Sequence, residues 1–138
     1  MINIELVKTR LEAETLYTVE LGRHREIVLQ ELAELPILYI NYATVESKSP
    51  NAAVEASAYN LNGEDLVQFI DVEICTEVEN LHTDFLKVNK ALAGWTPIEH
   101  ELDHIAFSLA QGGVIGEDNT RIRWLSRYRT GFPTLNIL

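Results

Sequence analysis

The run HELDH at residues 100–104 has the spacing of a zinc-protease motif. On an α-helix, histidines four residues apart lie on one face and ligate Zn²⁺ together, while the intervening glutamate acts as a general base. Several features argue against this chemistry here. No histidine follows His104 to supply a third ligand, Ala110 and Phe107 stand where the extended form of the motif needs a ligand and a glycine, and Asp103 adds a charge.

The residues after this run favour a strand over a helix. Large apolar side chains alternate with small ones from Ile105 to Ala110, and Pro97 lies just upstream. A strand would place Glu101 opposite His100 and His104, so the base would point away from the metal. We therefore expect a protein that is not an enzyme, with no catalytic residue, metal ligand or cofactor. A zinc-dependent hydrolase that uses these three residues stays as the alternative.

The other residues with reactive side chains favour structural roles. Cys75 is the only cysteine and lies in an apolar run, so we expect a buried thiol. His24 and His82 stand beside charged residues and are expected at the surface. Trp95 and Trp124 are expected in the core. The sequence has no nucleophile elbow, phosphate-binding loop or dinucleotide fingerprint.

Composition predicts one acidic domain over residues 1–138. Its 138 residues are 46% hydrophobic and carry a formal charge of −10, which disfavours gripping the phosphate backbone of DNA. All 21 acidic residues lie within residues 1–120, whereas residues 121–138 hold four of the 11 basic ones. We expect neither a secretion signal nor a membrane span.

The basic residues near the end of the chain form a candidate interface. Alternation places Arg121, Arg123, Arg127 and Arg129 on one face of a predicted strand, opposite an aromatic face that includes Trp124. We expect these arginines to pair across strands with acidic positions such as Asp71 and Glu73, and a binding stripe or pairs between subunits stay open. The polar segment 46–64, with Glu55 and Tyr59, is a second candidate for contacts.

The elements that position these residues follow from periodicity. Helices are predicted over residues 3–15, 24–34 and 77–93, the last beginning with a capping box at residues 76–79 and ending at Gly94. Residues 16–21 alternate and could instead form a short strand. Strands are predicted over 37–45 and 65–77, and two more around a turn in the last third. We expect an α+β fold, a mainly antiparallel sheet of about four strands with two or three helices packed on it.

Several of these segments together resemble a known family. They are Leu35-Pro36 leading into ILYINY, the strand LVQFIDVEI, the helix end ALAGWTP at 91–97 and the closing strand RIRWLSRYRTGF. Their order resembles the tail-terminator, or tail-completion, proteins of contractile-tailed and Mu-like bacteriophages. The HELDH run is not part of that pattern, and residues 16–30 match it poorly.

The resemblance implies a structural virion protein. Such a subunit forms a six-fold ring with copies of itself, caps the tail tube and joins it to the head connector or neck, next to the sheath. It needs no cofactor and contacts no membrane, and DNA passes through its lumen without specific binding. Its expected location is the tail or neck of a virion assembled in the host cytoplasm. A small acidic adaptor unrelated to phages is a further alternative.

Overall fold

The computed structural model describes residues 2–22, 27–47, 65–99, 102–103 and 105–133. Its elements, in chain order, are α1 (Ile4–Thr15), β1 (Thr18–Leu21), the 3₁₀ turn η1 (Leu29–Glu31), β2 (Ile37–Ser47), β3 (Asp65–Glu77), the 3₁₀ turn η2 (Val78–Asn80), α3 (Leu81–Leu92), β4 (Ile98–Glu99), β5 (Leu102–Asp103), β6 (Ile105–Asp118) and β7 (Arg121–Pro133). None of the described helices is both long and apolar enough to cross a bilayer.

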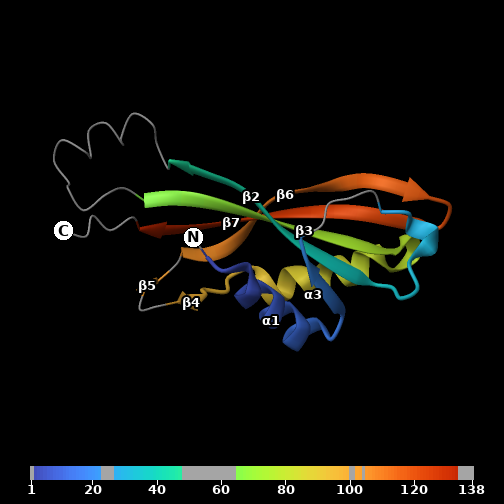
Figure 1. Cartoon of the computed structure of the whole chain (residues 1–138), viewed down its shortest axis with the longest axis horizontal. Helices are drawn as coiled ribbons and strands as arrows, with labels where there is room; N and C mark the ends of the chain where they lie inside the picture. The colour runs from blue at the N-terminus through green and yellow to red at the C-terminus, as the bar shows by residue number, and fades with distance from the viewer. Residues whose placement is uncertain (1, 23–26, 48–64, 100–101, 104, 134–138) are drawn as a thin grey trace.

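Five strands form the main sheet, in the order β1-β2-β3-β7-β6. β1 is parallel to β2, and the other three pairings are antiparallel. α1 and α3 lie side by side on one face of this sheet (Figure 1). The α+β class with a mainly antiparallel sheet is thus confirmed, with five strands instead of about four. The described residues hold two α-helices.

The predicted first helix is confirmed as α1. The side chain of Asn3 accepts a hydrogen bond from the backbone N–H of Glu5 and so caps the start of the helix. Val7 and Leu11 recur at helical spacing and are fully buried against the sheet. The last residue of the helix is Thr15. Leu16 follows it with a left-handed backbone, φ of 64°, and the chain then turns toward β1.

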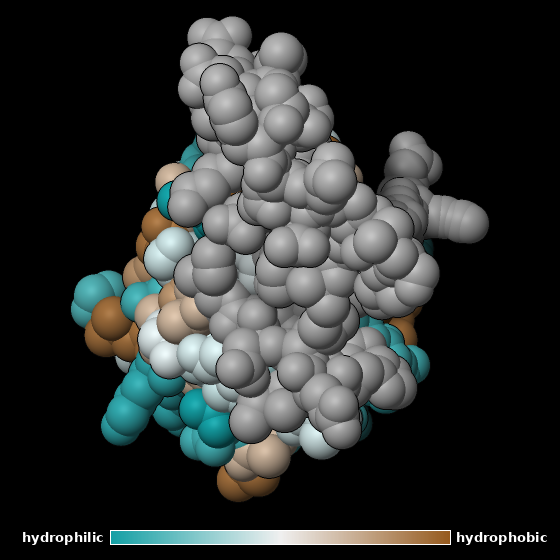
Figure 2. All heavy atoms as spheres, turned by 90° about the vertical axis from the view of Figure 1, so that its left-hand side faces the viewer, coloured by the Kyte–Doolittle hydropathy of each residue, from teal (hydrophilic) through white to brown (hydrophobic). Residues whose placement is uncertain are grey.

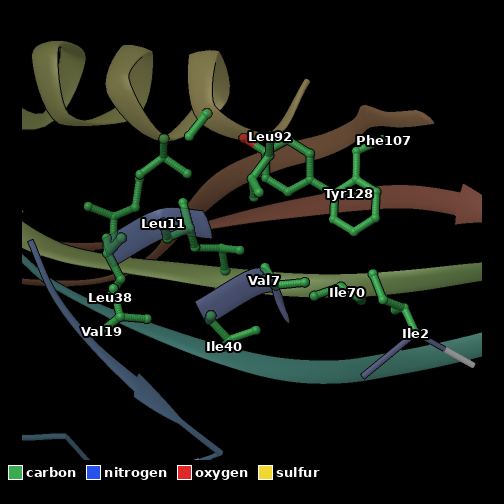
Figure 3. Close-up of a cluster of buried hydrophobic side chains, with 14 residues drawn as sticks. Ile2, Val7, Leu11, Val19, Leu38, Ile40, Ile70, Leu92, Phe107 and Tyr128 are labelled. Carbon is green, nitrogen blue, oxygen red and sulfur yellow. The ribbon is translucent and has the colours of Figure 1, made fainter. Parts of the chain in front are cut away.

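The core lies between the helices and the sheet. Figure 3 shows side chains from the helices and from the strands pointing into the same layer, where Leu92, Phe107 and Tyr128 belong to one buried cluster. The rings of Phe107 and Tyr128 stack at 6.4 Å, and Trp95 meets Phe107 edge to face at 5.4 Å. Burial of this apolar surface is the main force that holds the helices on the sheet.

The predicted capping box at the start of the third helix is wrong. The hydroxyl of Thr76 donates to the buried carboxylate of Asp84 at 2.5 Å instead of capping a backbone N–H. A 3₁₀ turn fills residues 78–80, and the α-helix begins only at Leu81. Gly94, with φ of 83°, follows the helix end as predicted, since glycine adopts this conformation without strain.

The predicted helix over residues 24–34 is also wrong in the part that the structure describes. Only the single 3₁₀ turn η1 forms, and residues 32–36 bend toward β2. The guanidinium of Arg121 donates to the backbone oxygens of Leu29 and Leu32, at 2.6 and 3.0 Å. These two hydrogen bonds tie the segment to β7, and the helix predicted at this point does not form. Leu29 packs there with Ile37 and Cys75, on the face opposite the helices.

The edge strand β6 pairs with β7 irregularly. Its register shifts between Ile105 and Ser108, between Leu109 and Gln111, and between Val114 and Gly116. Regular pairing over consecutive residues is kept at 111–114, where Gly112 faces the indole of Trp124. A β-carbon at Gly112 would stand 2.7 Å from the indole Cζ2, so only glycine fits.

Candidate functional site

The HELDH run does not lie on a helix in the residues that can be described. Leu102 and Asp103 form β5, which pairs antiparallel with β4, Ile98 with Asp103 and Glu99 with Leu102. Residues 100, 101 and 104 lie outside the described residues. Strand pairing within the run does not match the helix that places both histidines of a zinc protease on one face. Among the described residues, no group of three His, Cys, Asp or Glu side chains could hold a metal ion.

The arginine stripe of β7 is paired within the chain, as predicted. Arg127 donates two hydrogen bonds to Asp71, at 2.8 and 3.0 Å, and Arg123 donates to Glu73 at 2.8 Å. Asp71 lies directly opposite Arg127 in the ladder, whereas Glu73 is reached diagonally. Together with the 3.3 Å contact from Arg121 to Glu77, these pairs form a charge ladder along the face of β3 and β7 that points away from the helices.

The two central carboxylates of this charge ladder are largely shielded from solvent. The side chains of Asp71 and Glu73 are only 14% and 12% exposed. Hydrogen bonding to Asp71 raises the pKa of Arg127 above its usual value, and the ion pair persists at any pH at which the carboxylate is charged. Charged groups that are already paired and partly buried contribute little to the binding of a partner. The ladder therefore stiffens the sheet.

Arg129 differs from the other three arginines. It is exposed, and no acidic partner is found for it among the described residues. In the ladder it faces Phe69 on β3 and Ser108 on β6. Of the predicted interface arginines, it alone keeps a guanidinium open to solvent. Glu55 and Tyr59 lie outside the described residues.

The predicted structural role of Cys75 is confirmed. Its thiol is fully buried next to Leu29 and Ile37, and burial raises its pKa to about 11. A thiol that stays protonated at neutral pH is a poor nucleophile. His82 lies on the exposed surface of α3 as expected, and His24 is outside the described residues. Trp95 and Trp124 both pack against the core.

A buried polar cluster joins three elements and was not predicted. Asp84 of α3 accepts a hydrogen bond from the hydroxyl of Tyr17 at 2.7 Å and another from Thr76. Burial, followed by the bond to this carboxylate, raises the pKa of Tyr17 well above its usual value. Both carboxylate oxygens have donors, so the cluster is satisfied as a structural link. Its only sequence signal was an aspartate on the apolar side of a helix.

The exposed edge of the sheet offers a surface of another kind. From Ser108 to Asp118, no strand of the described part of the chain pairs with the outer side of β6. Residues 105–116 contain no charged side chain, in a chain of net charge −10. Leu109, Val114 and Ile115 are each more than a third exposed along this strand.

Figure 2 shows the molecule from one end, where the coloured residues include both hydrophilic and hydrophobic ones. Among the described residues, the uncharged edge of β6 is the surface that we take as the candidate for an interaction. No protein-family model matches the sequence, and no curated protein is significantly similar to it.

Proposed function

We propose that this chain is a non-catalytic structural subunit that assembles with copies of itself, of the kind that the tail-terminator resemblance predicts. In that role it forms a ring that caps a phage tail tube and connects it to the head. The observation that carries the proposal is the uncharged, exposed edge of β6. An open strand edge presents unpaired N–H and C=O groups, and natural proteins usually protect such edges with charges or cover.

The lack of charge at this edge allows a copy of the same chain to be the partner. Two chains of charge −10 repel one another, so they associate best through a strip without charged groups. The acidic residues of β6, Glu117 and Asp118, stand at one end of the strand. The strip at 105–116 precedes them and keeps these carboxylates out of the contact.

The three register shifts of β6 set the extent of such a contact. Bulges bend a strand and interrupt its pairing, which prevents sheets from adding strands without limit. Regular pairing spans Gln111 to Val114 between the second and third shifts, and it resumes over Gly116 to Asp118, where the acidic residues lie. We expect a defined contact of a few main-chain hydrogen bonds, supported by the apolar side chains on either side, as a closed ring requires.

The charge ladder is consistent with this role. Three of the four arginines of β7 are matched by carboxylates of β3, so they contribute rigidity and leave the face near neutral. The excess negative charge lies elsewhere on the chain. In a ring, an acidic bore would repel the DNA that passes through it and would keep the duplex from adhering.

The test is the mass of the assembled protein. Native mass spectrometry and negative-stain electron microscopy of the full chain should reveal a closed ring of several subunits. A Val114→Lys variant places a charge in the regular part of the edge and should leave smaller species. Val28→Lys is the matched control, since Val28 is 50% exposed, like Val114 at 51%, but lies outside the sheet.

Two results would contradict the proposal. The first is a chain that stays monomeric at high concentration and on addition of purified tail tubes. The second is an assembly that Val114→Lys and Val28→Lys affect equally. Stoichiometric zinc that is lost on His104→Ala would favour the hydrolase alternative instead.

A further inference from the structure

Leu16 combines two unfavourable features. Its backbone is left-handed, with φ of 64°, a conformation that glycine adopts freely but that crowds the β-carbon of a leucine. Its side chain is also 86% exposed, the largest value among the exposed large hydrophobic residues of the described chain. A helix end of this kind normally carries glycine. Contacts among the described residues explain neither the strain nor the exposure.

The surroundings of Leu16 are hollowed on both sides. One hollow lies between the end of α1 and α3 and is lined by Thr15, Lys87 and Lys90. The other lies toward β2 and is lined by Tyr17, Glu34 and Pro36 among others. Leu16 lines both hollows and forms the ridge between them.

The two hollows differ in charge. Lys87 and Lys90 border the first together with Glu14, whose carboxylate is already paired with Arg10 at 3.1 Å. The ammonium group of Lys87 lies 5.3 Å from the ring centre of Tyr17. Glu34 borders the second and accepts a hydrogen bond from Thr18 at 3.3 Å. A cationic side and an anionic side thus flank one apolar ridge.

This arrangement is complementary to itself. When a two-fold axis passes through the ridge, each side of one copy faces the opposite side of the other. Lys87 and Lys90 of one copy then lie opposite Glu34 of its partner. The two-fold axis repeats this pairing, and the two Leu16 side chains contact each other between the two pairs. The same surface on an unrelated acidic partner would leave Glu34 opposed by like charge.

We propose that Leu16 is the centre of a two-fold contact between copies of this chain, with the two Leu16 side chains packed against each other and Lys90 paired with the partner's Glu34. This contact is separate from the edge of β6 and stands whether or not that edge pairs. Burial in the dimer removes Leu16 from water and accounts for a leucine where glycine is the usual residue. The area is small, so the dimer should dissociate in the micromolar range.

Sedimentation equilibrium of the full chain, from about 1 to about 500 µM, tests the contact because weak dimers dissociate across this range. The wild type should dimerise, or, where β6 also pairs, form an assembly with twice the mass. Leu16→Gly should abolish the dimer or halve that mass. The variant should melt no lower than the wild type, since glycine relieves the backbone strain. Leu16→Asn, which tolerates the same backbone, serves as a second variant.

Asn119→Gly is the matched control for relieved strain. Within the described ranges, Asn119 is the other non-glycine residue with positive φ, 57°, and it lies in the turn between β6 and β7. This substitution should leave the dimer unchanged. For the charges, Lys90→Glu and Glu34→Lys should each weaken dimerisation, and the double variant should restore it.

The proposal is overturned by a wild type that is monomeric at every concentration, or by a dimer that persists in both Leu16 variants. It is also overturned if the double charge variant fails to recover. A mass that Val114→Lys reduces and Leu16→Gly leaves unchanged would support the β6 contact and reject this one. The reverse pattern would reject the β6 contact alone.

Discussion

Replacing Gly112 by alanine should destabilise the fold, because the indole of Trp124 occupies the space that a side chain would need. The new β-carbon would stand 2.7 Å from Cζ2, far closer than an ordinary contact of 3.4–4 Å. The indole has little freedom to withdraw, since its Nε1 donates to the hydroxyl of Ser126 at 2.9 Å and its ring meets Phe85 edge to face at 5.7 Å. Overpacking of this kind costs about 1–3 kcal/mol.

The neighbouring Gly113 provides the control, because a β-carbon there meets nothing within 4 Å. Gly113→Ala should leave stability unchanged or raise it by about 0.5 kcal/mol, as alanine restricts the unfolded chain. Urea denaturation followed by tryptophan fluorescence gives both free energies of unfolding. Combining Gly112→Ala with Trp124→Phe should recover part of the loss. Equal effects of the two alanine substitutions would refute the packing argument.

Two further predictions concern polar groups. Arg121→Gln removes the donor to two backbone oxygens and should lower the free energy of unfolding by about 2 kcal/mol. Hydrogen exchange at residues 29–32 should also become faster. The control Arg129→Gln should lower the free energy of unfolding by less than about 0.5 kcal/mol, and equal losses in the two variants would contradict this prediction. Burial raises the pKa of Cys75 from 9.0 to about 11, and also raises those of Tyr17 and Tyr128. These groups stay protonated in the folded chain where the unfolded chain ionises, so their stabilising contribution is lost as the pH rises. For Cys75 the contribution is complete below about pH 9 and is lost as the pH rises to about 11, whereas for the two tyrosines the loss begins near pH 10 and continues above it. Melting curves across this range should show the loss, and Cys75→Ala should reduce it; a flat profile would contradict the burial argument.

Elements with a clear apolar period could be predicted from the sequence. The strand over residues 65–77 has the predicted bounds, because its apolar side chains alternate with acidic ones and one face must be buried. The pairing of Asp71 with Arg127 followed from the same alternation, since a matched charge face on each strand leaves few other registers.

Features set by distant residues could not be predicted. The segment after β1 has a helical period, but its carbonyls bond to Arg121, which lies some 90 positions along the chain. Alternation places Gln68 on the apolar face of β3, but the sequence does not show its partner: the side chain is fully buried and accepts a hydrogen bond from the backbone N–H of Ile2. Thr76 has the position of a helix cap, and the buried Asp84 takes its hydroxyl instead. In each case a tertiary partner outweighs the local signal.

The place of β7 in the sheet affects how the chain can fold as it is made. β7 follows every other described strand in the sequence, yet it lies between β3 and β6 and joins them. Until residues 121–133 leave the ribosome, β3 lacks one neighbour along its whole length and β6 has none. Until β7 is made, the nascent chain therefore carries unpaired edges on both β3 and β6, and such edges favour aggregation of strand-rich chains. β7 pairs with both edges at once, so folding of the sheet should be a cooperative event.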